Sequence, residues 1–304
     1  MERYYSYSRF LKEFFGQKVY KICIDGGFTC PNRDGRLAYG GCSFCSQGGS
    51  GEFCESRVLS VSDQLLSGRR QTGAKHSGSG YIAYYQAYTG TYGSPDHLRT
   101  LYQPAMEADH IVALSIGTRP DCLSRPVLDL LEEMNRRKPV FIEMGLQTCH
   151  DATADRMNRC YPTSVFTDAV LRLKKAGIRV TAHIILGLPG ESLDMQLETV
   201  DYLNGLPVDG VKMSMLYVLK DTALGRLYAS RPFPVFTPES YIDLLISCIQ
   251  AFRPDIVLER ITGDPPRDLL IAPRWGLGKG EVLNRIRHEM KVRDAWQGKY
   301  YSQS

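Results

Sequence analysis

Hydrophobic residues gather in short runs along this chain, and each run has the length of a β-strand. Seven such runs lie at residues 19–24, 81–85, 111–116, 140–146, 180–186, 211–217 and 256–258. Several are apolar at nearly every position, which is typical of strands in a parallel sheet that is covered on both faces. The pattern therefore predicts seven strands, most of them buried inside a sheet.

Helical periodicity fills the intervals between these runs. Residues 125–137 follow a good N-cap, Ser124, and similar patterns cover 163–176 and 191–203. Strand and helix alternation predicts βαβ units, roughly six of them before residue 220, which is short of an eight-unit barrel. We therefore expect an α/β fold, a partial (β/α)6 TIM-like barrel, whose ligands bind at the carboxyl ends of the strands.

The chain divides into three segments on this pattern. Residues 1–18 are basic and aromatic, residues 19–229 form the partial barrel, and residues 230–304 form a small C-terminal α/β extension. Three prolines within residues 230–238 mark the second boundary. The extension is predicted to contain a helix, a short strand, a loop and a last helix near residues 279–293.

Composition narrows the class of protein. The 304 residues are 43% hydrophobic, 10% aromatic and 23% charged, which excludes a disordered chain. The net charge of +4 permits a nucleic-acid partner without requiring one. No apolar stretch approaches the ~20 residues of a membrane span and no signal-peptide core is visible, so we expect a cytoplasmic protein without a membrane contact.

Cysteines carry the strongest chemical signal. Three of the nine, Cys30, Cys42 and Cys45, lie in the loop after the first predicted strand, and the last two form a CxxC pair. In a reducing compartment such clusters are more often metal ligands than disulfides. An iron–sulfur cluster held by three thiolates would leave one iron open for a non-protein ligand. This reading is favoured, but spacing alone leaves two others open.

The first of these is a structural zinc site, which would need a fourth ligand. Cys23 and Cys54 are candidates for it, although neither belongs to a second CxxC pair. The second is that the cysteines are incidental. The six cysteines outside the loop motif have no CxxC mate, so a second cluster is not expected.

Three cysteines after the first strand of a parallel βα array, with Phe44 inside the CxxC pair, resemble the radical S-adenosylmethionine (SAM) enzymes. Eleven residues separate Cys30 from Cys42, more than is usual in that family. The longer loop is similar to the YhcC/YtqA-type subgroup, whose core is close to that of the Elongator catalytic subunit. Further matching segments lie at residues 85–89, 115–121, 143–148, 182–191, 260–264 and 297–298.

The resemblance implies two cofactors and an electron donor. Cys30, Cys42 and Cys45 would bind a 4Fe-4S cluster, whose open iron binds the amino and carboxylate groups of S-adenosyl-L-methionine. Reductive cleavage of that cofactor gives a 5′-deoxyadenosyl radical, which abstracts a substrate hydrogen. A flavodoxin or ferredoxin would supply the electron.

It also implies seven cofactor-binding residues: Phe44, Gln86, Thr89, Arg119, Glu143, His183 and Lys212. Phe44 would pack near the adenine, or else only anchor its loop. Gln86 and Thr89 end the second strand, where the family usually holds the methionyl amine, but the usual Gly-Gly-Glu is absent.

Three of these residues are polar positions within apolar strands. Glu143 and Lys212 are each either a cofactor contact or half of a core ion pair, because a buried charge is costly unless paired. His183 is either a site residue or a satisfied core histidine. Arg119 is either the partner of Glu143 or a bidentate grip on the cofactor carboxylate.

The Elongator-like core implies a tRNA partner. The implied reaction converts 5-carboxymethylaminomethyl-uridine at the wobble position into 5-aminomethyl-uridine. Alternatives are a small-metabolite or protein substrate, and a non-catalytic, metal-stabilised tRNA-binding adaptor. The first 21 residues hold five Lys or Arg against two Glu, and the last helix carries Arg287, Lys291 and Arg293. These basic ends suit phosphate contacts, with the interleaved aromatics stacking a base, but they also suit solvated helix faces.

Overall fold

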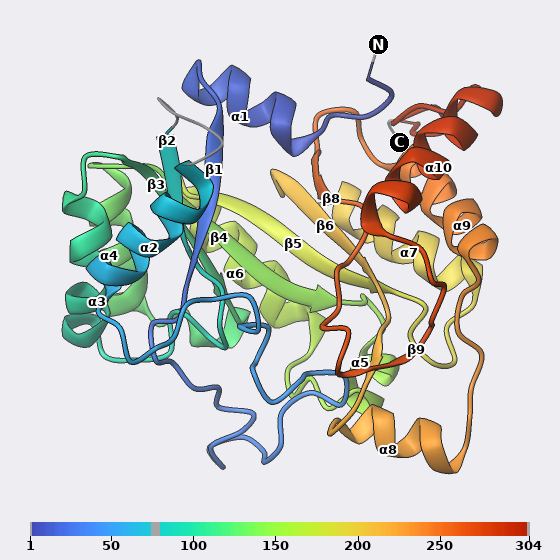
Figure 1. Cartoon of the computed structure of the whole chain (residues 1–304), viewed down its shortest axis with the longest axis horizontal. Helices are drawn as coiled ribbons and strands as arrows, with labels where there is room; N and C mark the ends of the chain where they lie inside the picture. Colours follow the sequence, from blue (N-terminus) through green and yellow to red (C-terminus); the bar gives the residue numbers. More distant parts are fainter. Residues whose placement is uncertain (1, 74–79, 303–304) are drawn as a thin grey trace.

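A curled sheet of seven parallel strands forms the centre of the molecule (Figure 1). The computed structural model describes residues 2–73 and 80–302. The strand order is β1-β2-β3-β4-β5-β6-β8, so each strand lies beside the next one along the chain, with β7 outside this sheet. The strands are β1 (Val19–Ile24), β2 (Gly80–Tyr85), β3 (Ile111–Thr118), β4 (Val140–Gln147), β5 (Arg179–Leu186), β6 (Gly210–Met215) and β8 (Val257–Arg260).

Helices connect the strands and cover the outer, convex face of the sheet, as Figure 1 shows. They are α2 (Val61–Gly73), α3 (Pro95–Glu107), α4 (Arg125–Asn135), α6 (Thr163–Lys175), α7 (Leu193–Asn204) and α9 (Pro238–Ala251). In α4 the buried positions include Val127, Leu131 and Met134, so one apolar stripe meets the sheet. This layering buries both faces of most strands, which is why their sequences are apolar throughout.

The expected fold class is confirmed as a partial barrel of parallel strands. Observed strand ends agree with the expected ones within one or two residues, and the seventh strand, β8, comes from the expected C-terminal extension. The run at 211–217 was too long, because β6 ends at Met215. The chain then turns into β7 (Val218–Leu219), which pairs antiparallel with β9 (Leu270–Ala272). The three-segment division of the chain stays a prediction.

The N-terminal segment closes the end of the barrel that is formed by the amino ends of the strands. Helix α1 (Tyr7–Phe15) begins at Ser6, whose hydroxyl accepts from the amide of Arg9, and ends at Gly16. Its buried Phe10 packs among residues from the amino ends of the strands, including Phe141. Much of the aromatic content of this segment is therefore core, which leaves less of it to stack a base than the sequence suggested.

The two ends of the chain lie side by side beyond this helix. The backbone amide of Gln297 donates to the carbonyl of Arg3 at 2.9 Å, and the side chain of Gln297 accepts from the amide of Tyr5 at 2.8 Å. The remaining helices are α5 (Asp151–Arg156), α8 (Ala223–Ser230) and α10 (Lys279–Val292), with a short 3-10 turn, η1, at Pro120–Cys122. Across residues 2–73 and 80–302, no helix has the length and apolar character that a bilayer crossing requires.

Candidate active site

A cavity of about 320 Å³ opens at the carboxyl ends of the strands. It is lined by nine of the ten expected site residues: Cys30, Cys42, Phe44, Cys45, Gln86, Thr89, Arg119, Glu143 and His183. Lys212 is not in its lining, but its ammonium contacts the carboxylate of Glu143. Residues that span more than 150 positions of the chain therefore face one hollow, while their individual roles stay predictions.

The loop that carries the three cysteines connects β1 to α2 and is held in place by its neighbours. The amide of Ser43 donates to the carbonyl of Met157 at 2.9 Å, and the carbonyl of Ser43 accepts from Leu224 at 2.8 Å. The side-chain amide of Asn158 donates to the carbonyl of Gly41 at 2.8 Å. Segments that follow α5 and begin α8 thus fix both sides of the CxxC pair.

The thiols of this loop lie in surroundings that suit a cationic centre. Burial raises the pKa of Cys42 to about 12, and the nearby Cys45 and Cys30 add to that rise, while Arg119 opposes it. Burial likewise raises the pKa of Cys45, against the pull of Arg33. Three mutually close thiols that are costly to ionise alone would be ionised by bound iron, because a metal stabilises the thiolate form. The residues present therefore fit an iron–sulfur cluster.

A structural zinc site would need a fourth ligand beside the three cysteines. Zinc needs all its sulfur ligands at about 2.3 Å from a single ion, whereas three thiolates of a cluster each bind a different iron. Cys54, one candidate fourth ligand, hydrogen-bonds to Cys23, the other, and Cys23 also contacts the side-chain oxygen of Gln86 at 3.1 Å.

Glu143 is the centre of a buried ionic network. Its side chain is 1% exposed and accepts from Lys21 at 2.5 Å, Ser115 at 2.6 Å and His183 at 2.9 Å, and also from Lys212. Burial alone would favour the protonated acid, but the two ammonium groups hold the pKa of Glu143 well below its usual value. Glu143 and Lys212 therefore form a buried ion pair, while a cofactor contact of either residue stays a prediction.

Arg119 does not contact Glu143, so that part of the sequence analysis was wrong. Its guanidinium instead holds Asp121 in a bidentate pair, at 3.0 and 2.8 Å, and lies 4.8 Å from the centre of the Tyr161 ring. Arg119 comes one residue after β3 ends, so its side chain reaches the loop rather than the neighbouring strand. It still faces the cysteines across the cavity.

Sequence reasoning missed several residues of this region. Lys21 contacts Glu143 and, with Lys212, lies over the ring of Tyr84 at 4.5 and 4.7 Å. Glu259 lies within 4 Å of both ammonium groups. A charge in an otherwise apolar run was the signal that identified Lys212, and it was equally available for Lys21. Tyr84 carried no such signal, because a tyrosine is ordinary in a strand.

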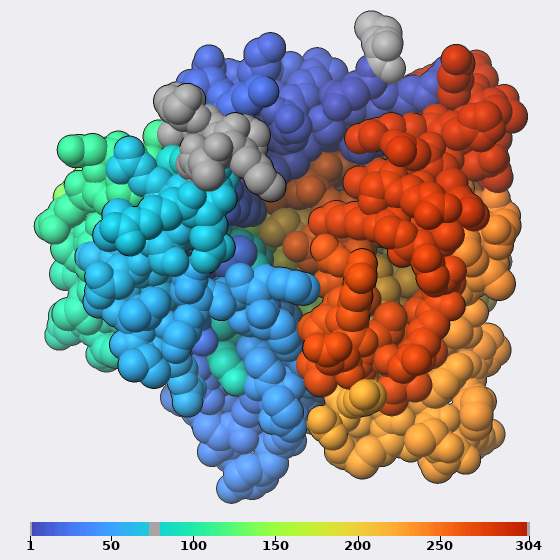
Figure 2. All heavy atoms as spheres, in the orientation of Figure 1, coloured from blue at the N-terminus to red at the C-terminus, as the bar shows by residue number. Residues whose placement is uncertain are grey.

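A second cavity, of about 430 Å³, opens between the two edge strands, β1 and β8. It shares Tyr84, Gln86 and Arg260 with the first cavity, so the two adjoin across these side chains. Figure 2 shows a hollow between the blue segments near the N-terminus and the orange-red C-terminal segment. Five cations and two acids line this lateral opening: Lys21, Lys212, Arg260, Lys279 and Arg287, and Glu2 and Glu259. Because Lys21 and Lys212 are paired with Glu143 and Glu259, the positive charge of the opening comes from Arg260, Lys279 and Arg287.

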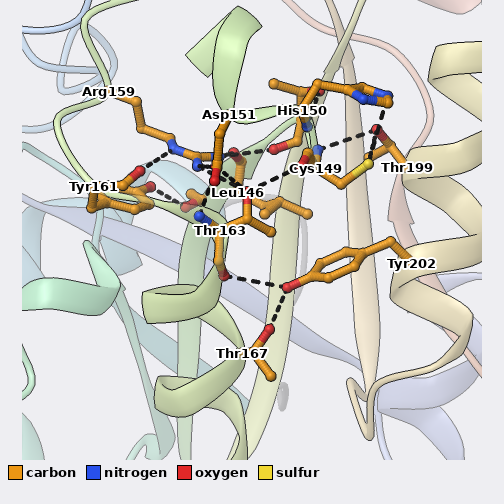
Figure 3. A network of polar contacts seen from close by, with 12 residues as sticks. Leu146, Cys149, His150, Asp151, Arg159, Tyr161, Thr163, Thr167, Thr199 and Tyr202 are labelled. Atoms are coloured by element: carbon orange, nitrogen blue, oxygen red, sulfur yellow. Dashed lines mark hydrogen bonds and ion pairs between the residues drawn. The ribbon is translucent and has the colours of Figure 1, made fainter. Parts of the chain in front are cut away.

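A buried arginine supports the other side of the site (Figure 3). Arg159 is 1% exposed, and its guanidinium donates to five oxygens: the carbonyls of Leu146, Thr148 and Tyr161, the carboxylate of Asp151 and the hydroxyl of Thr163. These bonds tie the end of β4 to the turn at residues 157–161. That turn also supplies Met157 and Asn158, the anchors of the cysteine loop.

Comparison with known proteins defines the class. The Radical SAM superfamily profile matches residues 30–203, and the profile of the Radical_SAM C-terminal domain matches residues 208–292. Because the first match spans more than half of the chain, the chain belongs to the radical SAM superfamily. Members of this superfamily are enzymes that use a 4Fe-4S cluster and S-adenosylmethionine.

Individual relatives narrow the placement. The chain is 40% identical over 300 residues to the uncharacterized protein YtqA of Bacillus subtilis, which covers 99% of this chain and 93% of the relative. It is 35% identical over 262 residues to protein YhcC of Escherichia coli (strain K12), with 86% and 84% covered. The archaeal Methanocaldococcus infernus Elp3 with an N-terminal deletion has the same fold, with a TM-score of 0.68 at 15% identity. That match covers 92% of this chain and 64% of the archaeal chain.

The histidine of the site gives a prediction about pH. Burial lowers the pKa of His183 from 6.5 to about 4, although its hydrogen bond to Glu143 acts in the opposite direction. The folded protein thus keeps a neutral imidazole where the unfolded chain is already protonated. Stability should therefore fall as the pH drops from 7 to 5, because protons favour the unfolded state in this range.

Urea unfolding of the loaded protein at pH 7, 6 and 5 measures this effect. We expect His183→Gln to show a shallower fall than the wild type, and exposed His288→Gln to follow the wild type. An identical pH dependence in wild type and His183→Gln would contradict the assignment.

Proposed function

We propose that this radical SAM enzyme acts on the wobble uridine of tRNA and converts 5-carboxymethylaminomethyl-uridine into 5-aminomethyl-uridine. One observation carries the proposal: a lateral opening lined by Arg260, Lys279 and Arg287 adjoins the cavity that the three cysteines face. Both the phosphates of an RNA and the carboxylate of this side group are anions that such an opening attracts. The Elp3-like fold supports the same direction.

The cluster and S-adenosylmethionine would supply a 5′-deoxyadenosyl radical, which takes one hydrogen atom from the carbon between the amine and the carboxylate. The hydrogen atom would end on 5′-deoxyadenosine. The substrate radical would then lose its N–H proton to solvent and one electron to the cluster, which cofactor cleavage had oxidised, and the resulting imine would be hydrolysed to 5-aminomethyl-uridine and glyoxylate. A flavodoxin or ferredoxin would provide the electron for the first cleavage.

The residues of the chain would divide this work by position. Cys30, Cys42 and Cys45 would bind three irons. Phe44 packs beside Met157 and Leu224 at the cavity wall, and in this proposal it would contact the adenine.

The polar residues of the cavity would orient the two ligands. Gln86, Thr89 and Arg119 line the part of the cavity around the cysteines, where the amino and carboxylate groups of the cofactor would lie. His183 donates one ring nitrogen to Glu143, which leaves its other nitrogen free to accept a hydrogen bond from the substrate amine. Arg260 lines both cavities and would bind the substrate carboxylate.

Two other substrate classes, a small metabolite and a protein, would use the same cofactors. Neither needs the extended cationic surface that adjoins the lateral opening. Superfamily membership does not support the non-catalytic adaptor. A cytoplasmic location follows from the tRNA substrate and belongs to the proposal.

Nucleoside mass spectrometry of tRNA from cells that lack the gene tests the substrate. We expect 5-carboxymethylaminomethyl-uridine to accumulate and 5-aminomethyl-uridine, with the methylaminomethyl form made from it, to disappear. The wild-type gene should restore the profile and a Cys42→Ala gene should not. An unchanged profile in a strain without a redundant pathway would exclude this tRNA reaction and leave the radical chemistry in place.

A further inference from the structure

We propose that a groove between the N-terminal segment and α10 binds single-stranded nucleic acid. One base of the nucleic acid would stack on Trp296, and the backbone phosphates would lie beside Arg287 and Lys291. We call this feature the terminal groove. The inference rests on the proposed function, because it supplies the surface that would hold the RNA next to the reacting uridine.

The terminal groove is a built feature of the fold. It has a volume of about 680 Å³ and is lined by Arg3, Tyr4, Arg287, Lys291, Trp296 and acidic Glu2, among others. Figure 1 shows its two walls, where the blue N-terminal segment passes beside the red α10. Arg3 joins the walls, because its guanidinium donates at 3.1 Å both to Asp294 and to the carbonyl of Ala295.

The charges of α10 are separated between two faces. On one face Arg293 pairs with Asp243 at 2.7 Å and Glu289 at 2.9 Å, and Arg285 pairs with Glu281 at 3.0 Å. On the other face Arg287 and Lys291 are one helical turn apart, and neither has an ion pair with any described carboxylate.

Only this second face borders the terminal groove, so its positive charge is not neutralised. The basic residues of the last helix, which the sequence grouped together, therefore differ in role. Arg293 belongs to the neutralised face.

An exposed aromatic accompanies the free cations. The side chain of Trp296 is 43% exposed, and the ammonium of Lys299 lies 4.7 Å from its ring centre. A large aromatic surface left in water beside cations is the combination that single-stranded nucleic-acid sites use, since bases stack on the ring while phosphates meet the charges. An acidic peptide would use the cations but would gain little from the indole.

The terminal groove lies next to the active site. It shares Glu2, Tyr4 and Arg287 with the lateral opening, and that opening adjoins the cofactor cavity at Tyr84 and Arg260. An RNA strand in the terminal groove would thus lie at the entrance through which an unstacked base reaches the cavity. The class of occupant is a loop of RNA with unpaired bases.

Binding of tRNA to the cluster-loaded enzyme, measured across a salt series, tests the proposal. We expect the double variant Arg287→Gln and Lys291→Gln to weaken binding at least tenfold and to flatten the slope of log affinity against log salt by about 1 to 2. Trp296→Ala should weaken binding about 5- to 100-fold, with Trp296→Phe partly restoring it. The matched double variant Arg285→Gln and Arg293→Gln should stay within about twofold of the wild type.

Thermal midpoint and iron content confirm that each variant is folded before binding is compared. Suppose that the wild-type enzyme binds and converts tRNA, and that the Arg287 and Lys291 variant keeps the same affinity and salt dependence. The terminal groove is then not the RNA-binding site, and the proposed function stands. If wild-type enzyme neither binds nor converts tRNA, the proposed function fails first. Equal competition by polyglutamate and by RNA would overturn a nucleic-acid occupant.

Discussion

Purified without oxygen, the Cys42→Ala protein should be colourless and should form no 5′-deoxyadenosine from S-adenosylmethionine and a reductant. Cys42 sits in the cavity wall, and hydrogen bonds of the adjacent Ser43 to Met157 and Leu224 hold the loop in place. A cluster with two protein ligands leaves two irons uncoordinated by the chain and is lost. Iron and sulfide content, visible absorbance and product chromatography measure the result. Cys30→Ala and Cys45→Ala should behave alike.

Two other cysteines provide the control. Cys122 lies outside the lining of the cavity, in the turn after β3, and Cys248 is buried in α9. Their alanine variants should keep the wild-type iron content and activity. Cys23→Ala and Cys54→Ala should also keep the cluster, since neither thiol is needed as a fourth ligand. Full iron content in Cys42→Ala would contradict the assignment of the three ligands.

The largest loss of stability is expected from Arg159→Met. The methionine fills much of the same space but donates no hydrogen bond, so the buried carbonyls of Leu146 and Thr148 lose their side-chain donor and the partner charge of Asp151 is unpaired. Because each buried carbonyl left without a partner costs about 1–3 kcal/mol, we expect a loss of about 3–5 kcal/mol in the free energy of unfolding, to which the half-exposed Asp151 adds little. In urea unfolding this loss should lower the midpoint concentration and leave unchanged the slope of the free energy of unfolding against urea concentration.

Arg156→Met is the matched control, three residues away. Arg156 is exposed and donates to the hydroxyl of Thr153 at 2.9 Å, so its loss should change the free energy of unfolding by no more than about 0.5 kcal/mol. Iron occupancy gives a second readout, because the Arg159 network holds the turn that anchors the cysteine loop. Equal stability of the two variants would show that the network contributes little.

Strands were the most predictable part of the fold, because parallel strands covered on both faces are apolar throughout. The run that reaches Tyr217 misled for the same reason. Leu216 is buried in a small cluster with Met157 and Leu224, so the loop after β6 is as apolar as the strand itself. Nor does the sequence show that Phe10 faces the barrel, since its neighbours there come from strands far along the chain.

The site was predictable in its members but not in its pairings. Loops at one end of a parallel barrel converge, so residues chosen at strand ends came together in one cavity. Which cationic side chain neutralises Glu143 depends on the curvature of the sheet, because this curvature brings Lys21 of β1 near Lys212 of β6. Arg119 looked equally suitable, and only the end point of β3 directs it to Asp121 instead.

The bridge between Ser6 and Leu258 has a consequence for biosynthesis. A ribosome adding ~5–20 residues per second needs roughly 12–50 s to pass from one of these positions to the other. During that interval the apolar face of α1, with Phe10 and Leu11, can contact only strands that have already been synthesised, and β8 is still missing. The nascent chain therefore exposes part of an apolar surface near its N-terminus, and a chaperone that covers this surface should improve the yield of native protein.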